Sequence, residues 1–108
     1  MVEEWFDQEL WNDNFEDFDD EDLLEIIEEA TEDIKLLIQS LHSDEPDVIA
    51  KSAHKIISVC GNFGFLHCAS LAADVEQKSK AGTLINDEKQ RLIEMTERVI
   101  SELHERTQ

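Results

Sequence analysis

Apolar residues recur along most of the chain every three or four positions, the spacing of one face of an α-helix. This spacing predicts four helices, over about 22–42, 46–63, 65–82 and 86–105. The positions that define their buried faces are Leu23, Ile27, Ala30, Ile34, Leu37 and Leu41; Ile49, Ala53, Ile56, Cys60 and Phe63; Phe65, Cys68, Leu71, Ala72 and Val75; and Leu92, Met95 or Thr96, Val99 and Leu103.

Residues typical of helix ends separate the four periodic stretches. Pro46 suits the first turn of a helix, Gly64 permits a tight reversal, and Gly82 follows two lysines as a helix terminator. Asn86 or Asp87 is expected to cap the last helix. Four helices joined by short links predict an all-α fold, an antiparallel four-helix bundle with a short extra N-terminal helix.

The extra helix is expected around Asp7 to Asp13, in a segment rich in both aromatic and acidic residues. A disordered tail rarely contains so many large apolar side chains. We therefore expect residues 1–20 to cap one end of a bundle formed by residues 21–108. The alternative is a segment that stays mobile until it meets a partner. The aromatic residues concerned are Trp5, Phe6, Trp11, Phe15 and Phe18.

Charge is distributed unevenly along the 108 residues, which are enough for one domain. The formal net charge is −18. Residues 1–47 hold nineteen acidic side chains and one basic side chain, whereas residues 48–108 hold eight of each. Such a chain repels nucleic acid and anionic membranes, so we expect neither as a partner.

The sequence also limits the compartment. No stretch approaches the roughly 20 apolar residues of a membrane span. Glu3 and Glu4 have the wrong charge for the start of a secretory signal. Cys60 and Cys68 both fall on predicted buried faces and are interpreted as reduced thiols rather than a disulfide, so a cytoplasmic protein is expected.

The helix predicted from Pro46 carries the main candidate for chemistry, His54. Its outward face combines this histidine with small and basic residues, so another surface could approach the imidazole ring. A neutral imidazole is a competent nucleophile near neutral pH. The outward residues are Lys51, His54, Lys55, Ser58, Gly61 and Asn62.

A reversal at Gly64 is expected to bring a second helix alongside His54. His54 lies ten residues before Gly64, so residues near Asp74, ten residues after it, are expected level with the histidine, with Lys78 nearby. A carboxylate or an amide there, from Asp74 or Gln77, could hold one imidazole nitrogen and leave the other free. Lys51, Lys55 and Lys78 would then form a basic spot suited to a phosphoryl group.

Other kinds of site lack their signatures. The sequence has no Glu-x-x-His motif and no histidine pair four residues apart, so a metal site is not expected. It has no nucleotide-binding glycine loop and no constellation of acid, base and nucleophile, so an enzyme is not expected either. The remaining histidines, His42, His67 and His104, are interpreted as surface residues.

The segments Ala53-His54-Lys55-Ile56, Gly61-Asn62-Phe63-Gly64-Phe65 and Leu71 to Glu76 resemble the signature of the histidine phosphotransfer (HPt) family. The resemblance implies a four-helix bundle in which His54 carries a phosphoryl group between receiver-domain aspartates. It implies response-regulator receivers, and a hybrid sensor kinase, as partners. It also implies no cofactor in this chain, because the receiver supplies the Mg²⁺.

One departure from the family pattern leaves a second hypothesis open. The family usually has Lys-Gly three and four residues after the histidine, where this chain has Ile57 and Ser58. Lys51 or Lys55 would have to replace the missing lysine. The alternative is a binding module that sequesters a receiver, or another partner, without being phosphorylated. In either case a bundle of this size is expected to be monomeric.

Overall fold

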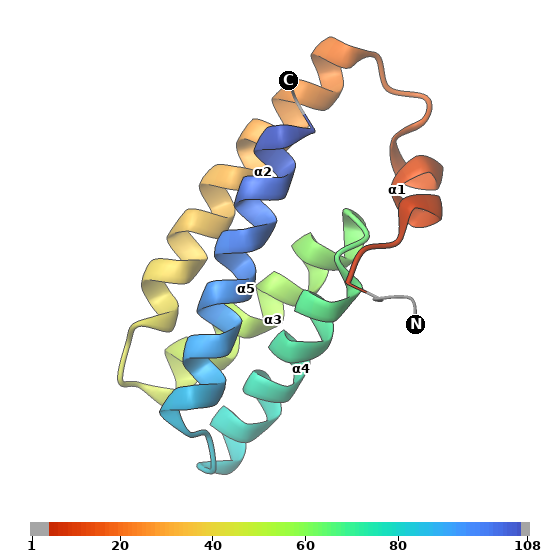
Figure 1. The fold of residues 1–108 in the computed structure, drawn as a ribbon. Coiled ribbons are helices and arrows are strands. Elements are labelled where there is room, and N and C mark those ends of the chain that lie inside the picture. Colours follow the sequence, from red (N-terminus) through yellow and green to blue (C-terminus); the bar gives the residue numbers. More distant parts are fainter. Residues whose placement is uncertain (1–4, 107–108) are drawn as a thin grey trace.

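The computed structural model describes residues 5–106, and within that range the chain forms five helices and no strand. Helices α2 to α5 alternate in direction and pack as a ring, in which α2 and α4 each contact both α3 and α5 (Figure 1). The predicted antiparallel four-helix bundle with a short extra N-terminal helix is therefore confirmed. Residues 1–4 of the predicted N-terminal segment (1–20) and residues 107–108 of the predicted bundle segment (21–108) lie outside the described range. The helices are α1 (Gln8–Phe15), α2 (Asp20–Leu41), α3 (Pro46–Asn62), α4 (Leu66–Ala81) and α5 (Asn86–Glu105).

The ends of the helices follow local chemistry. The carboxylate of Asp19 accepts a hydrogen bond from the backbone N–H of Asp22 at 2.8 Å and so begins α2. Pro46 is the first residue of α3, where its missing N–H is not needed. Gly82 ends α4 with a left-handed φ of 74°. Helix α1 runs two residues beyond the predicted end at Asp13.

The start of α5 differs from the expectation that Asn86 or Asp87 caps it. Both residues are already inside the helix, and Ile85 occupies the capping position. An isoleucine has no polar side chain to cap with. Instead, the side chain of Glu88 accepts a hydrogen bond from the Ile85 backbone N–H at 3.3 Å. The glutamate three residues ahead therefore replaces the expected cap.

The core lies along the ring axis, and α3 and α4 form its most closely packed pair. Met95 and Thr96 are the two alternatives for one position on the buried face of α5. Thr96 is fully buried, whereas Met95 is only half-buried. The Thr96 hydroxyl donates to backbone carbonyls one turn earlier, so it needs no other partner in the core. The largest fully buried apolar side chains are Ile34, Leu41, Ile56, Phe65, Leu92 and Leu103.

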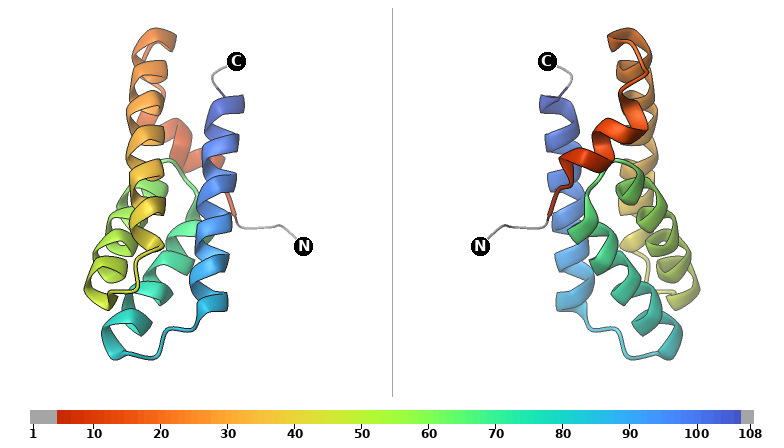
Figure 2. Two further views of the ribbon diagram at one scale, coloured as in Figure 1. Left: turned by 90° about the vertical axis from the view of Figure 1, so that its left-hand side faces the viewer. Right: turned by 90° about the vertical axis from the view of Figure 1, so that its right-hand side faces the viewer.

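The N-terminal residues from Trp5 onward lie against the end of the bundle where α3 turns into α4 (Figure 2). Phe15 stacks on Phe63 with ring centroids 4.9 Å apart, and Trp5 and Phe6 each lie 5.1 Å from Phe65. From α5, the guanidinium groups of Arg98 and Arg106 lie 4.0 Å above the rings of Trp5 and Phe6, respectively. Contacts of this type contribute about 1 kcal/mol each, so together they hold the segment in place.

Candidate functional site

His54 lies in the middle of α3, and its side chain is 68% exposed. The helix puts it there because the opposite face of α3 is buried in the core through Ile49, Ala53 and Ile56. The residues one turn before and after His54 are Ala50 and Ser58, and neither extends a long side chain over the ring. The imidazole is therefore open to a visiting surface.

Glu76 on α4 holds the imidazole ring from one side. Its two carboxylate oxygens lie 3.2 and 3.0 Å from Nδ1 of His54. An ionised carboxylate can only accept, so Nδ1 must carry the proton and donate it. In the neutral ring, the other nitrogen, Nε2, then has the free lone pair. This tautomer is the one in which Nε2 can act as a nucleophile.

Glu76 is itself held in place by Lys80, one turn further along α4. The Lys80 ammonium lies 3.0 Å from a carboxylate oxygen of Glu76, whose side chain is only 15% exposed. The hydrogen bonds from Lys80 and, second, from His54 lower the pKa of this carboxyl below its ordinary value. Glu76 therefore remains ionised at neutral pH and keeps the role of acceptor.

Glu76 takes the position that was expected for Asp74, and the helix geometry explains why. The buried stripe of α4 runs through Ala72, Val75 and Ser79. Because each residue turns the helix by about 100°, Glu76 falls on the flank of that stripe that faces α3, and Asp74 falls on the other flank. Asp74 is exposed there, and it is Glu76 that reaches the histidine.

The same helix geometry also changes which lysine of α4 lies in the basic spot beside His54. Lys78 shares the flank of Asp74, and its ammonium pairs with the carboxylate of Glu88 at the start of α5. It is therefore directed away from His54, and Lys80 replaces it. The hollow beside the imidazole, between α3 and α4, is lined by Asp47, Ala50, Lys51, His54, Lys55, Glu76 and Lys80.

A second hollow adjoins the other side of His54, between α2 and α3. Its lining is largely apolar, and Leu36 within it is 60% exposed. Sequence reasoning missed this surface. The available signal was that Leu36 lies off the buried stripe of α2, an apolar residue on an otherwise acidic face. The lining residues are Asp33, Leu36, Leu37, His54, Lys55, Ser58 and Val59.

Gly61 and Asn62, also predicted at the site, lie further away, at the end of α3. Asn62 is about 12 Å along the helix axis from His54, and its carbonyl accepts a hydrogen bond from the Asn14 side chain at 2.8 Å. A Cβ at Gly61 would meet no atom within 4 Å. The N-terminal segment thus covers the end of α3 two turns from His54, and the imidazole ring stays exposed.

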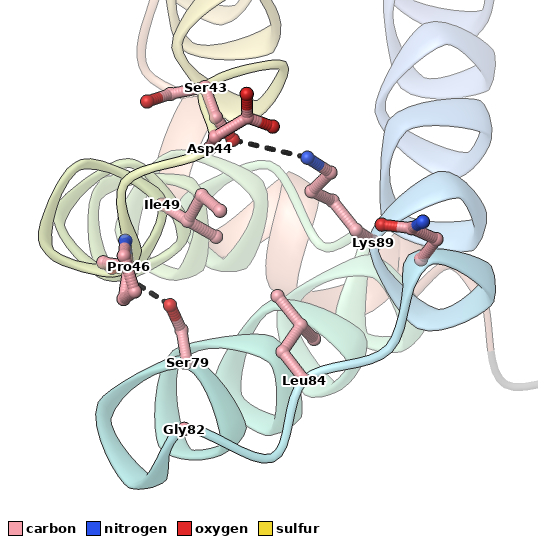
Figure 3. A pocket seen from close by; sticks show the side chains of 9 residues that line it. Ser43, Asp44, Pro46, Ile49, Ser79, Gly82, Leu84 and Lys89 are labelled. Carbon is pink, nitrogen blue, oxygen red and sulfur yellow. Dashed lines mark hydrogen bonds between the residues drawn. The ribbon is translucent and has the colours of Figure 1, made fainter.

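A third hollow lies at the opposite end of the bundle, where the α2–α3 and α4–α5 links meet (Figure 3). Two of its polar side chains already have structural partners. The hydroxyl of Ser79 donates to the Pro46 carbonyl at 2.8 Å, and the Lys89 ammonium donates to the Ser43 carbonyl at 3.1 Å. We interpret these hydrogen bonds as structural contacts that hold the α2–α3 connection against α4 and α5, rather than as a site for chemistry.

Residues 5–106 contain neither a metal-binding cluster nor a membrane-spanning helix. No group of three or more histidine, cysteine, aspartate or glutamate side chains there is arranged to hold a metal ion. None of the helices in this range is both long and apolar enough to cross a membrane.

Comparison with known proteins identifies the family. The family model of the Hpt domain matches residues 22–103, which include all four bundle helices up to the last turn of α5. Searches of curated proteins and of solved structures gave no match. The family match covers more than half of the chain and agrees with the resemblance found in the sequence around His54. The chain belongs to the Hpt domain family, whose members are phosphocarrier modules.

Proposed function

We propose that this chain is a histidine-containing phosphotransfer protein that shuttles a phosphoryl group between receiver-domain aspartates through His54. The observation that carries the proposal is the tautomer imposed on an exposed imidazole. Nδ1–H donates a hydrogen bond to the carboxylate of Glu76, so in the neutral ring the lone pair of Nε2 is available to a visiting partner.

The transfer step needs only this nitrogen and a correctly placed phosphoryl group. The Nε2 lone pair attacks phosphorus, an N–P bond forms, and the P–O bond to the receiver aspartate breaks, which returns its carboxylate. The product ring is substituted at Nε2 and protonated at Nδ1, so it carries a positive charge. The carboxylate of Glu76 at 3.0 Å compensates that charge.

The lysines around the hollow between α3 and α4 would stabilise the added phosphate. Lys51 and Lys55 are exposed on the same helix as His54, and Lys80 reaches the same hollow from α4. Ammonium groups hydrogen-bond equatorial phosphoryl oxygens without strict geometry. We assign the role of the family's missing lysine to Lys51 and Lys55, with Lys80 in support.

The second hollow would receive the partner. Leu36, Leu37 and Val59 provide an apolar surface directly beside the reactive ring, and Ser58 lies level with it. A receiver that rests on this surface places its aspartyl phosphate over His54. We include Gly61 and Asn62 at the edge of this contact, because Gly61 has no side chain and the space beside it is open.

Several further properties belong to this proposal. The carrier has no turnover and no cofactor of its own, and the Mg²⁺ of the reaction is supplied by the receiver. It acts as a cytoplasmic monomer, with receivers and a hybrid sensor kinase as partners. The reduced, buried Cys60 and Cys68 support the choice of compartment.

A second candidate function is a receiver-binding module that is never phosphorylated. The observation that favours it is the pair Ile57 and Ser58, where the family usually has Lys-Gly. The side chain of Ile57 is apolar and half-buried, so it supplies no charge at that position. The docking surface beside His54 would serve this function equally well.

Incubation with phosphorylated receiver domains distinguishes the two functions. The full chain should remove the phosphoryl group from a cognate receiver, carry it as an acid-labile label, and pass it to a second receiver. If a receiver binds the chain stably but no label ever appears on the chain, the binding module is the correct assignment.

Altering Glu76 should slow the transfer without abolishing it. We expect Glu76→Ala to reduce the initial rate about 10-fold, the lower end of the 10- to 100-fold loss seen when the carboxylate partner that orients a metal-bound imidazole is removed. Glu76→Gln should lose less, since its amide oxygen can still accept from Nδ1. Asp74→Asn, on the other flank of α4, is the matched control and should transfer at the normal rate. Equal rates for all four proteins would contradict the role of Glu76.

The lowered pKa of Glu76 also predicts a pH dependence of stability. As the pH falls, the unfolded chain takes up a proton at this carboxyl first, at about the ordinary glutamate value of 4.5. The stabilising contacts of Glu76 are therefore fully present above this value and are lost as the pH falls through the lower pKa of the folded state. Urea unfolding of the wild type and Glu76→Gln should show a stability difference that shrinks toward acid. A difference that grows toward acid would contradict this assignment.

A further inference from the structure

Two cysteines that the proposed transfer does not use face each other inside the α3–α4 pair. Cys60 lies in the last turn of α3 and Cys68 in the first turn of α4, on either side of the Gly64 reversal. Both are fully buried free thiols, and their sulfur atoms are 3.4 Å apart. Seven residues of chain separate them, so they form the narrow end of a helical hairpin.

The separation is close to that of a disulfide. An S–S bond is about 2.0 Å long, so the two sulfur atoms need to approach by about 1.4 Å. The helices that carry them are the most closely packed pair in the bundle. The sulfur of Cys60 already forms a hydrogen bond with that of Cys68, which shows that the side chains point toward each other. Small side-chain rotations could therefore bring the sulfurs into bonding distance.

We infer that Cys60 and Cys68 are a redox modification site, at which a low-molecular-weight disulfide oxidises the two thiols to an intramolecular disulfide. One cysteine thiolate attacks the small disulfide and releases one small thiol. The second cysteine attacks the mixed disulfide and releases the other small thiol. The two protein thiols lose two hydrogens in total, and the small disulfide gains them.

The surroundings make this reaction slow, and this suits a regulated bond. The hydrogen bond with Cys60 and, second, burial raise the pKa of the Cys68 thiol, so little thiolate is present while the hairpin is closed. Attack therefore proceeds when this end of the bundle opens transiently. Once formed, the bond ties together the two helices that carry His54 and Glu76, which keeps the carboxylate in register with the imidazole.

The full chain can be tested with oxidised glutathione under native conditions. The expected product is a monomer about 2 Da lighter than the reduced chain, because two hydrogens are lost. Trypsin leaves both cysteines on one peptide, residues 56–78, and chymotrypsin cuts between them at Phe63 and Phe65. The chymotryptic fragments should stay joined until a reductant is added. The oxidised chain should also show a higher midpoint of thermal unfolding, which reduction reverses.

Single variants separate this bond from other thiol reactions. Cys60→Ala and Cys68→Ala should each give, at most, a glutathione adduct or a disulfide-linked dimer, and never the lighter monomer. The inference is overturned if the wild type under native conditions gives only such adducts or dimers. It is equally overturned if the wild type stays reduced in buffer and cross-links only in urea.

Discussion

Replacing His54 by glutamine is expected to abolish phosphoryl transfer to this chain, the largest functional effect of any single substitution considered. Glutamine has a similar length and can donate a hydrogen bond to Glu76, but its amide nitrogen has no lone pair available for attack on phosphorus. The site of substitution is 68% exposed, so the fold should be unaffected. The measurement is acid-labile label on the chain after incubation with a phosphorylated receiver.

The matched control for this experiment is His67→Gln. His67 is also exposed and also on a bundle helix, at the start of α4, but it lies outside both hollows that adjoin His54. It should accept label like the wild type. Label that persists on His54→Gln and disappears from His67→Gln would move the phosphoacceptor to the other histidine.

Gly64→Ala is expected to give a large loss of stability, about 3 kcal/mol. Gly64 has a φ of 87°, which is unfavourable by about 1–2 kcal/mol for an alanine. An added Cβ would also lie 2.6 Å from the backbone oxygen of Asp7, whose N–H donates to the Gly64 carbonyl at 2.7 Å. Neither backbone can move without breaking the contact between the N-terminal segment and the α3–α4 reversal, so the steric term adds to the conformational term.

Gly82→Ala is a matched control for the conformational term alone. Gly82 also has a left-handed φ, 74°, but a Cβ there would meet no atom within 4 Å. We expect a loss of only about 1 kcal/mol. Urea unfolding of both variants measures the two terms. Equal losses would show that the close approach of Asp7 contributes nothing to the stability of the bundle.

The helices themselves could be predicted from the sequence because local signals and packing agree. Apolar residues repeat with the helical period, and Pro46, Gly64 and Gly82 mark helix ends through their own backbone preferences. The cap of α5 could not be predicted from the same rules. Ile85 has no capping side chain, and the compensation comes from Glu88, a residue that composition alone does not single out.

The site was only partly predictable, for a geometric reason. Periodicity within one helix is enough to place His54 outward, whereas the partner of its ring depends on how α4 is rotated against α3. Counting equal numbers of residues on either side of Gly64 finds the part of α4 that is level with His54. It does not find the flank of α4 that faces α3, so it selects Asp74 and Lys78 in place of Glu76 and Lys80. The rotation is fixed by which residues of α4 are buried.

Leu36 illustrates a different limit. A single apolar residue on an exposed helical face is common and has no meaning in isolation. Its significance comes from α2 packing beside α3, which puts Leu36 in the same hollow as His54. Only the assembled bundle makes it part of the docking surface that we propose.

The most direct measurement of the central claim is the site of phosphorylation, determined by NMR on the chain labelled with ¹⁵N-histidine and phosphorylated by a cognate receiver. The expected result is a phosphorus–nitrogen coupling at Nε2 of His54, with Nδ1 protonated and hydrogen-bonded to Glu76. A phosphoryl group on Nδ1 of His54, or on any other residue, would contradict the claim.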